Sequence, residues 1–247
     1  MTRWARVTWQ VPDPASFAPA LAAQLGTRSQ PGGGLGPDAW TLDLGSASLE
    51  IRPWLRESPT DDPLPGGRLV LEPVGSGEPT PEESELTADD GVAATERSLR
   101  LAGLGWATVE LDRAADELGM WLGDAPAADE PDTADPLLGA RARLRLAGGL
   151  PGDTVVLLEP STEGRLAASL ARDGEGPAAL YLRPAEALRA WAADARGRGV
   201  TLTARRVGPL GGSVLVATGP VAGPHLVIVD SRPARASRTP ATGTIAP

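Results

Sequence analysis

The order of strands and helices expected along this chain recurs three times, and this recurrence constrains the fold more than any other feature. A strand followed by a helix begins near residue 6, near residue 106 and near residue 178. The third copy is the clearest, with a strand at 178–183, a helix at 185–197 and strands at 200–206, 213–218 and 225–230. A repeated element order indicates a repeat architecture. The sequence therefore predicts an α+β protein of repeated βαβββ modules.

The first two copies follow the same order with different connections. In the first, Asp13 precedes a helical stretch that ends at Gly26, as N-terminal caps and C-terminal glycines do. In the first copy we expect a strand at 6–11, a helix at 14–25 and strands at 40–44, 48–51 and 68–72. In and around the second copy we expect a helix at 89–101, a strand at 106–111, a helix at 113–122, strands at 140–146 and 154–158, and a helix at 163–172.

Three polar segments divide the chain. Residues 75–90 are rich in Gly, Pro, Glu, Asp and Ser, residues 123–135 are similar, and the tail after residue 231 has no apolar periodicity. We expect a linker, a disordered-looking segment and a disordered tail there. The predicted divisions are an N-terminal module at 1–74, a linker with a helix at 75–103, a two-module domain at 104–231 and a tail at 232–247.

Charge and composition exclude several classes of function. The 247 residues have a formal net charge of −9, which disfavours binding to nucleic acid. The absence of cysteine excludes disulfides and thiolate metal sites. No apolar run is long enough to cross a bilayer or to act as a secretory signal, so we expect a cytoplasmic protein. All basic residues are Arg and Gly and Pro are abundant, a pattern that indicates a GC-rich bacterial genome.

Several stretches resemble one known family. The sequence Gly-Glu-Gly-Pro-Ala-Ala-Leu-Tyr-Leu-Arg at 174–183, the helix end at 195–200, and the strand ends at 155–160 and 225–230 resemble the modules of vicinal oxygen chelate proteins. Residues 7–53 resemble a further module. The family includes glyoxalases, methylmalonyl-CoA epimerases, extradiol dioxygenases and bleomycin-binding resistance proteins. The resemblance implies paired modules whose curled mixed sheets form a concave cleft, with metal-ligating His, Gln or Glu on the first and last strands of each module.

The residues that match those ligand positions carry no metal-binding groups. The resemblance places them on or near Trp106, on Val156, on Ala179 and on Val227. A divalent ion needs several converging donors, so we expect neither a metal ion nor another cofactor in this cleft. Glu50 occupies the carboxylate position of the N-terminal module. Its matching first-strand position lies near Arg6, and we expect Glu50 to pair with Arg6 or to be solvated.

His225, the single histidine, is a further candidate. It lies two residues before Val227, so both side chains face the same side of an extended strand. It could act as a hydrogen-bond donor or general base, although a hydrogen-bonded strand-end histidine is the simpler explanation. No H-E-x-x-H, P-loop or G-x-S-x-G motif is present. The candidate ligand-binding residues are Trp106, Ala179, Tyr181, His225, Val227 and Glu50.

Three functions remain open from the sequence. The first is a metal-free protein that binds a small aromatic or cationic ligand in the sheet cleft, as in the bleomycin-binding branch of the family. The second is a metal-dependent lyase, isomerase or dioxygenase with relocated ligands, drawn from Glu50, Glu110, Glu159, His225 and Asp230. The third is a structural role in assembly, with the repeat forming a monomeric pseudo-dimer in place of a homodimer.

Overall fold

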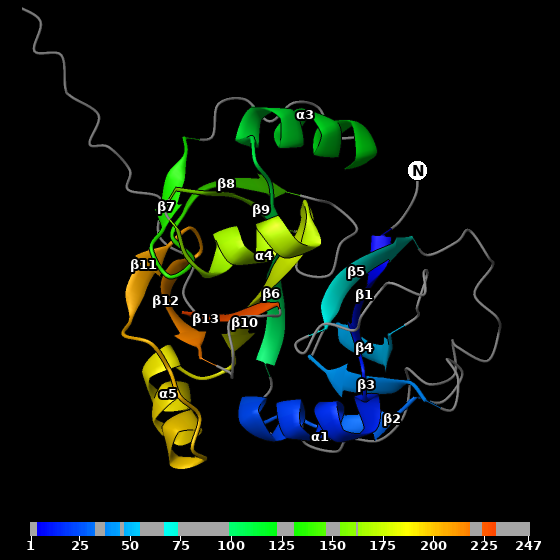
Figure 1. Ribbon diagram of the computed structural model, residues 1–247. Helices are drawn as coiled ribbons and strands as arrows, with labels where there is room; N and C mark the ends of the chain where they lie inside the picture. Colours follow the sequence, from blue (N-terminus) through cyan, green and yellow to red (C-terminus); the bar gives the residue numbers. More distant parts are fainter. Residues whose placement is uncertain are drawn as a thin grey trace, which may run out of the picture.

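The computed structural model describes residues 4–32, 38–44, 47–54, 67–73, 99–122, 131–146, 154–161, 163–217 and 224–230. These residues form two mixed β-sheets and four helices (Figure 1). The predicted α+β class and the repeated βαβββ order are both confirmed. Among the described residues, none of the helices has the length and apolar character needed to cross a membrane.

The N-terminal module forms a five-stranded sheet. Its elements are β1 (Trp4–Val11), α1 (Pro14–Leu25), β2 (Ser29–Pro31), β3 (Trp40–Asp43), β4 (Ser48–Pro53) and β5 (Arg68–Pro73). The strand order is β2-β3-β4-β1-β5, with β1 parallel to β4 and antiparallel to β5. The Asp13 side chain accepts a hydrogen bond from the Ser16 N–H and caps α1, and Gly26 ends the helix with a positive φ of 71°.

Two further modules share one eight-stranded sheet. The first contains β6 (Leu99–Ala107), α3 (Leu111–Leu122), β7 (Thr133–Asp135), β8 (Ala140–Leu146) and β9 (Thr154–Pro160). Helix α4 (Arg165–Asp173) leads to the second, which contains β10 (Gly176–Pro184), α5 (Leu188–Gly197), β11 (Arg206–Gly208), β12 (Gly211–Val216) and β13 (His225–Val229). The strand order is β11-β12-β13-β10-β6-β9-β8-β7. In each module the first strand is parallel to the last, and antiparallel pairing of β6 with β10 joins the modules.

The junction between β6 and β10 depends on a small residue. A Cβ atom added to Gly105 would lie 2.7 Å from the Cβ of Ala179 and 3.0 Å from Leu158 Cδ1. Only glycine therefore lets the two modules approach this closely. The sheet also curls until β7 and β11, its two end strands, come into contact. The barrel-like shape follows from this curl.

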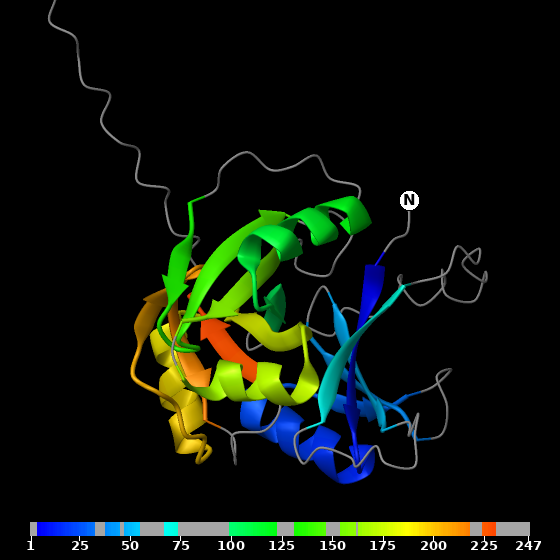
Figure 2. The same cartoon turned by 45° about the horizontal axis from the view of Figure 1, so that its top comes forward.

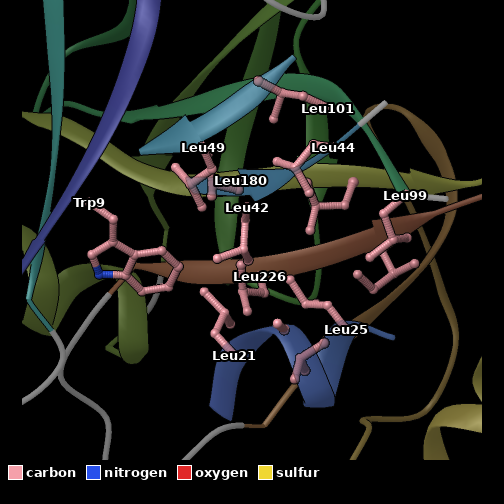
Figure 3. Close-up of a cluster of buried hydrophobic side chains, with 14 of the residues drawn as sticks. Trp9, Leu21, Leu25, Leu42, Leu44, Leu49, Leu99, Leu101, Leu180 and Leu226 are labelled. Atoms are coloured by element: carbon pink, nitrogen blue, oxygen red, sulfur yellow. The ribbon is translucent and has the colours of Figure 1, made fainter. Parts of the chain in front are cut away.

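A shared apolar core joins the two sheets. Buried side chains from β1, β3, β4 and α1 pack against β6, β10, β13 and α5, and Figure 3 shows Trp9, Leu21 and Leu42 facing Leu180 and Leu226. Burial of this size is the main favourable contribution to folding. A smaller cluster joins α3 to β9. The module helices thus cover one face of the eight-stranded sheet, and α4 covers the opposite face (Figure 2).

Four predicted elements differ from the structure. The strand predicted at 106–111 belongs to β6 only at 106–107, because β6 ends at Ala107 and α3 begins at Leu111. Residues 99–101, expected at the end of a helix, begin β6, because Leu99 and Leu101 alternate with exposed Arg100 and pack into the core. Residues 133–135, expected to be disordered, form β7. In 200–206, expected to be a strand, Leu202 makes an isolated bridge to Val216 and β11 begins only at Arg206. The rest of the predicted helix, 89–98, and the segments 75–90, 123–130 and 232–247 lie outside the described residues.

Candidate functional site

The concave face of the eight-stranded sheet is filled with apolar side chains. Val156, Ala179, Tyr181 and Val227 lie on this face, each at most 1 % exposed and within one apolar cluster. Leu166 of α4 packs into the same cluster, and α4 lies across this side of the sheet in Figure 1. The structure therefore brings three of the predicted candidates together, Ala179, Tyr181 and Val227, but it packs them against a helix.

Tyr181 is anchored by a buried carboxylate. Its hydroxyl donates a 2.7 Å hydrogen bond to Asp135 Oδ2, and Asp135 Oδ1 accepts from the N–H groups of Leu137 and Leu138 at 3.0 and 3.1 Å. Burial, followed by the charge of Asp135, raises the pKa of Tyr181 well above its ordinary value. Tyr181 thus stays a protonated donor, and the bond ties β10 to β7 across the interior of the curled sheet.

His225 is buried beside a serine. Its Nε2 lies 3.2 Å from Ser169 Oγ of α4, and both residues are about 5 % exposed or less. Burial first, and then the positive charge of Arg165, lowers the pKa of His225 to about 4. The imidazole is therefore neutral at neutral pH and has a free lone pair on one ring nitrogen.

Trp106 lies apart from the other candidates. Its side chain packs with the α3 cluster, on the face opposite α4, because side chains alternate along a strand. The neighbouring residue on the concave face is Gly105, which contacts the Ala179 and Tyr181 side chains closely. On the concave face this part of β6 therefore presents Gly105, which has no donor atom in a side chain.

Glu50 lies in the N-terminal sheet, on the face opposite α1. It is 2 % exposed, and its Oε1 accepts a hydrogen bond from Arg52 Nε. In the parallel register of β1 and β4, Thr8 is the partner of Glu50, and the Thr8 side chain is fully buried. The predicted partner of Glu50, Arg6, has a side chain outside the described part of the structure. Glu50 is therefore a buried ion-paired group.

The other predicted metal donors are separated from one another. Glu110 lies at the exposed start of α3, Glu159 accepts from the Leu111 N–H and from Arg141, and Asp230 pairs with Arg205. Across the described residues, no three His, Asp or Glu side chains gather in a way that could hold a metal ion. The groups present thus do not fit the metal that the fold family implies, and we derive no chemistry through one.

A pocket of about 330 Å³ opens where β6 ends and β10 begins, and we call it the β5–β10 pocket. One wall is 67–70 at the start of β5, and the other is 173–178 between α4 and β10. Ala107, Ser169 and Pro224 complete the lining. The pocket lies beside the apolar cluster of the concave face, since Ala107 and Ala178 belong to that cluster or pack on it. Its volume is within the range of small-molecule sites.

The two carboxylates of the β5–β10 pocket are already paired with arginines. Asp173 makes a bidentate ion pair with Arg172, with distances of 2.6 and 2.8 Å. Glu175 accepts from Arg113 at 2.6 Å and from the Val109 N–H at 2.6 Å. Mainly because of the Arg113 bond, the pKa of Glu175 falls to about 2. Each of the two carboxylates therefore already has an arginine as its partner.

Arg68, the cation of the opposite wall, also interacts with neighbouring side chains. The Arg68 guanidinium lies 4.7 Å above the centre of the Trp54 ring, and its Nε donates to Gln10 Oε1 at 2.8 Å. Such a cation–π contact holds the long side chain in place. The pocket thus combines fixed polar groups at its rim with apolar walls from Leu69, Val70 and Pro177.

Sequence reasoning missed Ser169 and Glu175. Ser169 is 56 residues from His225 and belongs to a helix outside the βαβββ repeat. Glu175 lies between Gly174 and Gly176, which both have positive φ, so the sequence could have predicted a turn here. Its partner Arg113 is 62 residues away, so the sequence could not have predicted the ion pair.

Comparisons with known proteins concern the fold. No family model matches the chain, and no curated protein matches its sequence. Among solved structures, methylmalonyl-CoA epimerase from Mycobacterium tuberculosis is similar at 23% identity and a TM-score of 0.45, over 56% of this chain and 92% of that one. A Streptomyces coelicolor methylmalonyl-CoA epimerase variant in complex with 2-nitronate-propionyl-CoA is similar at 23% identity and a TM-score of 0.41, over 53% and 96%. A hypothetical protein from Bacillus halodurans C-125 is similar at 18% identity and a TM-score of 0.42, over 55% and 96%.

Proposed function

We infer that the eight-stranded sheet, in which two βαβββ modules are joined at their first strands, has the vicinal oxygen chelate fold that the resemblance of the sequence implies. We propose that the protein binds a small organic ligand, aromatic or cationic, in the β5–β10 pocket and without a metal ion. The observation that carries this proposal is the pocket itself, about 330 Å³ with apolar walls and a polar rim. A volume of this size admits a single aromatic ring with a short substituent.

The chemistry of the rim favours an aromatic ring over a strong charge. Asp173 and Glu175 each bind an arginine already, so a cationic ligand gains little additional attraction from them. The net charge of −9 adds a modest long-range preference for cations. Most of the binding free energy therefore comes from burying the ring against Val70, Ala107 and Ala178.

The absence of a metal in this proposal is supported by the residues at the expected ligand positions. Gly105, Val156, Ala179 and Val227 have no side-chain donors. The alternative, a metal-dependent enzyme with relocated ligands, predicts a bound transition metal. Elemental analysis of protein purified without chelator tests it, and a stoichiometric metal would favour that alternative.

A matched ligand series tests the binding proposal. Benzyl alcohol, benzylammonium and benzoate share one ring and differ in charge, and calorimetric titration gives their dissociation constants. We expect the first two to bind in the millimolar range or tighter, benzoate more weakly than both, and Trp emission to change on binding. Failure of all three to bind would contradict the proposal, and binding of benzylammonium more than tenfold tighter than benzyl alcohol would identify a cation site.

Pocket variants locate the site. Ala178→Leu fills the β5–β10 pocket and should abolish binding, whereas Ala168→Leu adds the same atoms at an exposed position of α4 outside the pocket. Asp173→Asn, which keeps the size of the side chain, should weaken benzylammonium more than benzyl alcohol. Equal binding by wild type and Ala178→Leu, with both variants folded by circular dichroism, would place the ligand elsewhere.

We also propose that the chain is monomeric. β6 already pairs with β10 of the same chain, so the eight-stranded sheet is completed without a second copy. Analytical ultracentrifugation measures the mass in solution. A stable dimer at micromolar concentration would contradict this proposal.

A further inference from the structure

Ser169 and His225 form a buried pair at the wall of the β5–β10 pocket. Ser169 Oγ lies 3.2 Å from His225 Nε2, within the distance at which a base can take a hydroxyl proton. Ser169 lines the pocket and is 4 % exposed, and Pro224, the neighbour of His225, lines it too. Ser169 therefore borders the space that a ligand would occupy, and its hydroxyl is in contact with the buried imidazole.

The main chain of Arg165 also acts on the imidazole. Arg165 lies four residues before Ser169, and its backbone raises the pKa of His225, as an acceptor beside a ring N–H does. Because Nε2 faces Ser169, we assign the ring N–H to Nδ1 and the lone pair to Nε2. A base within hydrogen-bond distance of a hydroxyl, as His225 Nε2 is of Ser169 Oγ, is the arrangement that activates the hydroxyl as a nucleophile.

We propose that Ser169 and His225 act as a nucleophile–base pair that accepts the acyl group of a small aromatic ester held in the β5–β10 pocket. The inference rests on the proposed function, because the same pocket has to admit the ester. A metal ion is not required, since the imidazole supplies the base and the ester carbonyl is itself the electrophile. The apolar walls match an aryl group, and the buried position of Ser169 lowers the water concentration around the acyl carbon.

The reaction balances with water as the second reactant. Ser169 Oγ forms a bond to the ester carbonyl carbon while its proton moves to His225 Nε2. The bond from that carbon to the aryloxy oxygen breaks, the oxygen keeps the electron pair, and His225 returns the proton to it as the phenol leaves. Water then attacks the acyl-serine through the same base, which releases a carboxylic acid and restores the Ser169 hydroxyl.

The chain has few other nucleophilic side chains that an acyl donor could modify. It contains no cysteine, its basic side chains are arginines apart from His225, and it has a single tyrosine, buried at Tyr181. Background acetylation is therefore confined mainly to the N-terminal amine. We would incubate the full chain with 4-nitrophenyl acetate, follow 4-nitrophenolate by absorbance, and map the acetyl group by peptide mass spectrometry. We expect one acetyl group on the peptide that contains Ser169.

Matched variants separate this role from a structural one. Ser169→Ala should remove the adduct, and His225→Gln should slow acylation about 100-fold while leaving the serine in place. Ser161→Ala, at an exposed serine that bonds to Gly139, should acylate at the wild-type rate. Acylation of Ser169 at an unchanged rate in His225→Gln, or an adduct that maps to another residue, would overturn the inference.

Benzyl alcohol binding distinguishes the two proposals. If wild type binds benzyl alcohol but never acetylates Ser169, the nucleophile–base pair is refuted and the proposed ligand site stands. If neither binding nor acylation occurs, both are refuted. Ser169→Ala that still binds benzyl alcohol but does not acylate supports both, because the pocket is then intact and only the reacting oxygen has been removed.

Discussion

The two sheets of this protein complete the same module in different ways. In the N-terminal sheet the free edge of β1 is paired by the single strand β5, whereas in the eight-stranded sheet the equivalent edge of β6 is paired by β10, the first strand of another module. The faces opposite the module helices also differ. The N-terminal face carries the buried polar residues Thr8, Gln10 and Glu50, whereas the other face is mainly apolar and covered by α4.

The difference shows that strand order and face chemistry are separate properties of the module. A single strand is sufficient to satisfy the main-chain groups of the first strand, since one neighbour supplies all the hydrogen bonds of an edge. The polarity of the side chains on the opposite face then depends on which element packs against that face. Apolar residues suit the packed helix α4, and buried polar residues require partners of their own, as Glu50 has in Arg52.

The largest expected effect concerns the polar anchor inside the apolar sheet. Asp135→Ala removes the acceptor of three hydrogen bonds, from Tyr181, Leu137 and Leu138, and should lower the free energy of unfolding by about 4 kcal/mol. Tyr181→Phe removes one of the three and should cost about 1–2 kcal/mol. Urea denaturation measures both. A cost below about 1 kcal/mol for Asp135→Ala would show that the curled sheet closes without this anchor.

The second effect is a pH dependence that arises in the same sheet. Burial holds the folded-state pKa of His225 at about 4, below the ordinary 6.5, and Arg165 and Arg172 lower it while Asp173 opposes them. The unfolded chain takes up the proton first as the pH falls. The contribution of His225 to the free energy of unfolding is therefore fully present above pH 6.5. About 3 kcal/mol of it is lost as the pH falls from about 6.5 to 4, and this group causes no further loss below pH 4.

Denaturation curves at several pH values measure how the free energy of unfolding depends on pH, and His225→Gln provides the control. The variant should show a flatter profile between pH 6.5 and 4, because glutamine does not titrate. An identical slope in wild type and variant would mean that other groups cause the acid sensitivity.

The third effect tests the junction that distinguishes the paired modules. Gly105→Ala places a methyl group 2.7 Å from Ala179 Cβ, so it should destabilise the protein by about 2 kcal/mol. Gly197→Ala, at the end of α5 with nothing within 4 Å, should be neutral or slightly stabilising. Thermal unfolding compares the two variants. Equal stability would mean that β6 and β10 can separate without cost.

The smallest effect concerns the polar face of the N-terminal sheet. Thr8 is fully buried, and its Oγ1 has no hydrogen-bond partner among the described residues. Thr8→Val keeps the shape and removes the unsatisfied hydroxyl, so it should stabilise the protein by up to about 1 kcal/mol. Thr8→Ala, which also loses a methyl group, should not stabilise the protein. A clear loss of stability in Thr8→Val would reveal a partner for this hydroxyl.

The fold was largely predictable because local patterns determine it. Strand alternation, the Asp13 cap and the glycines that end helices lie within a few residues of the elements that they define, so the module order could be read directly. Strand β6 was assigned too late in the chain, since Leu99 and Leu101 follow a long polar segment that hid their alternation.

The candidate site was less predictable because it depends on contacts between distant residues. Ala179 and Val227, which the resemblance assigned to the cleft, lie on one face with Tyr181, but α4 packs on that face, which no local pattern indicated. A shift of one residue was enough to move Trp106 to the opposite side of the sheet. Whether any of these residues binds a ligand stays a prediction.

The two ways of pairing a first strand have a consequence for synthesis on the ribosome. β1 and its partner β5 both emerge within the first 73 residues, whereas β6 ends at residue 107 and β10 begins only at residue 176. A nascent chain therefore exposes the unpaired edge of β6 for on the order of ten seconds before translation delivers its partner. During that interval the half-built sheet is a template for intermolecular strand addition, so slowed elongation between these strands should increase aggregation.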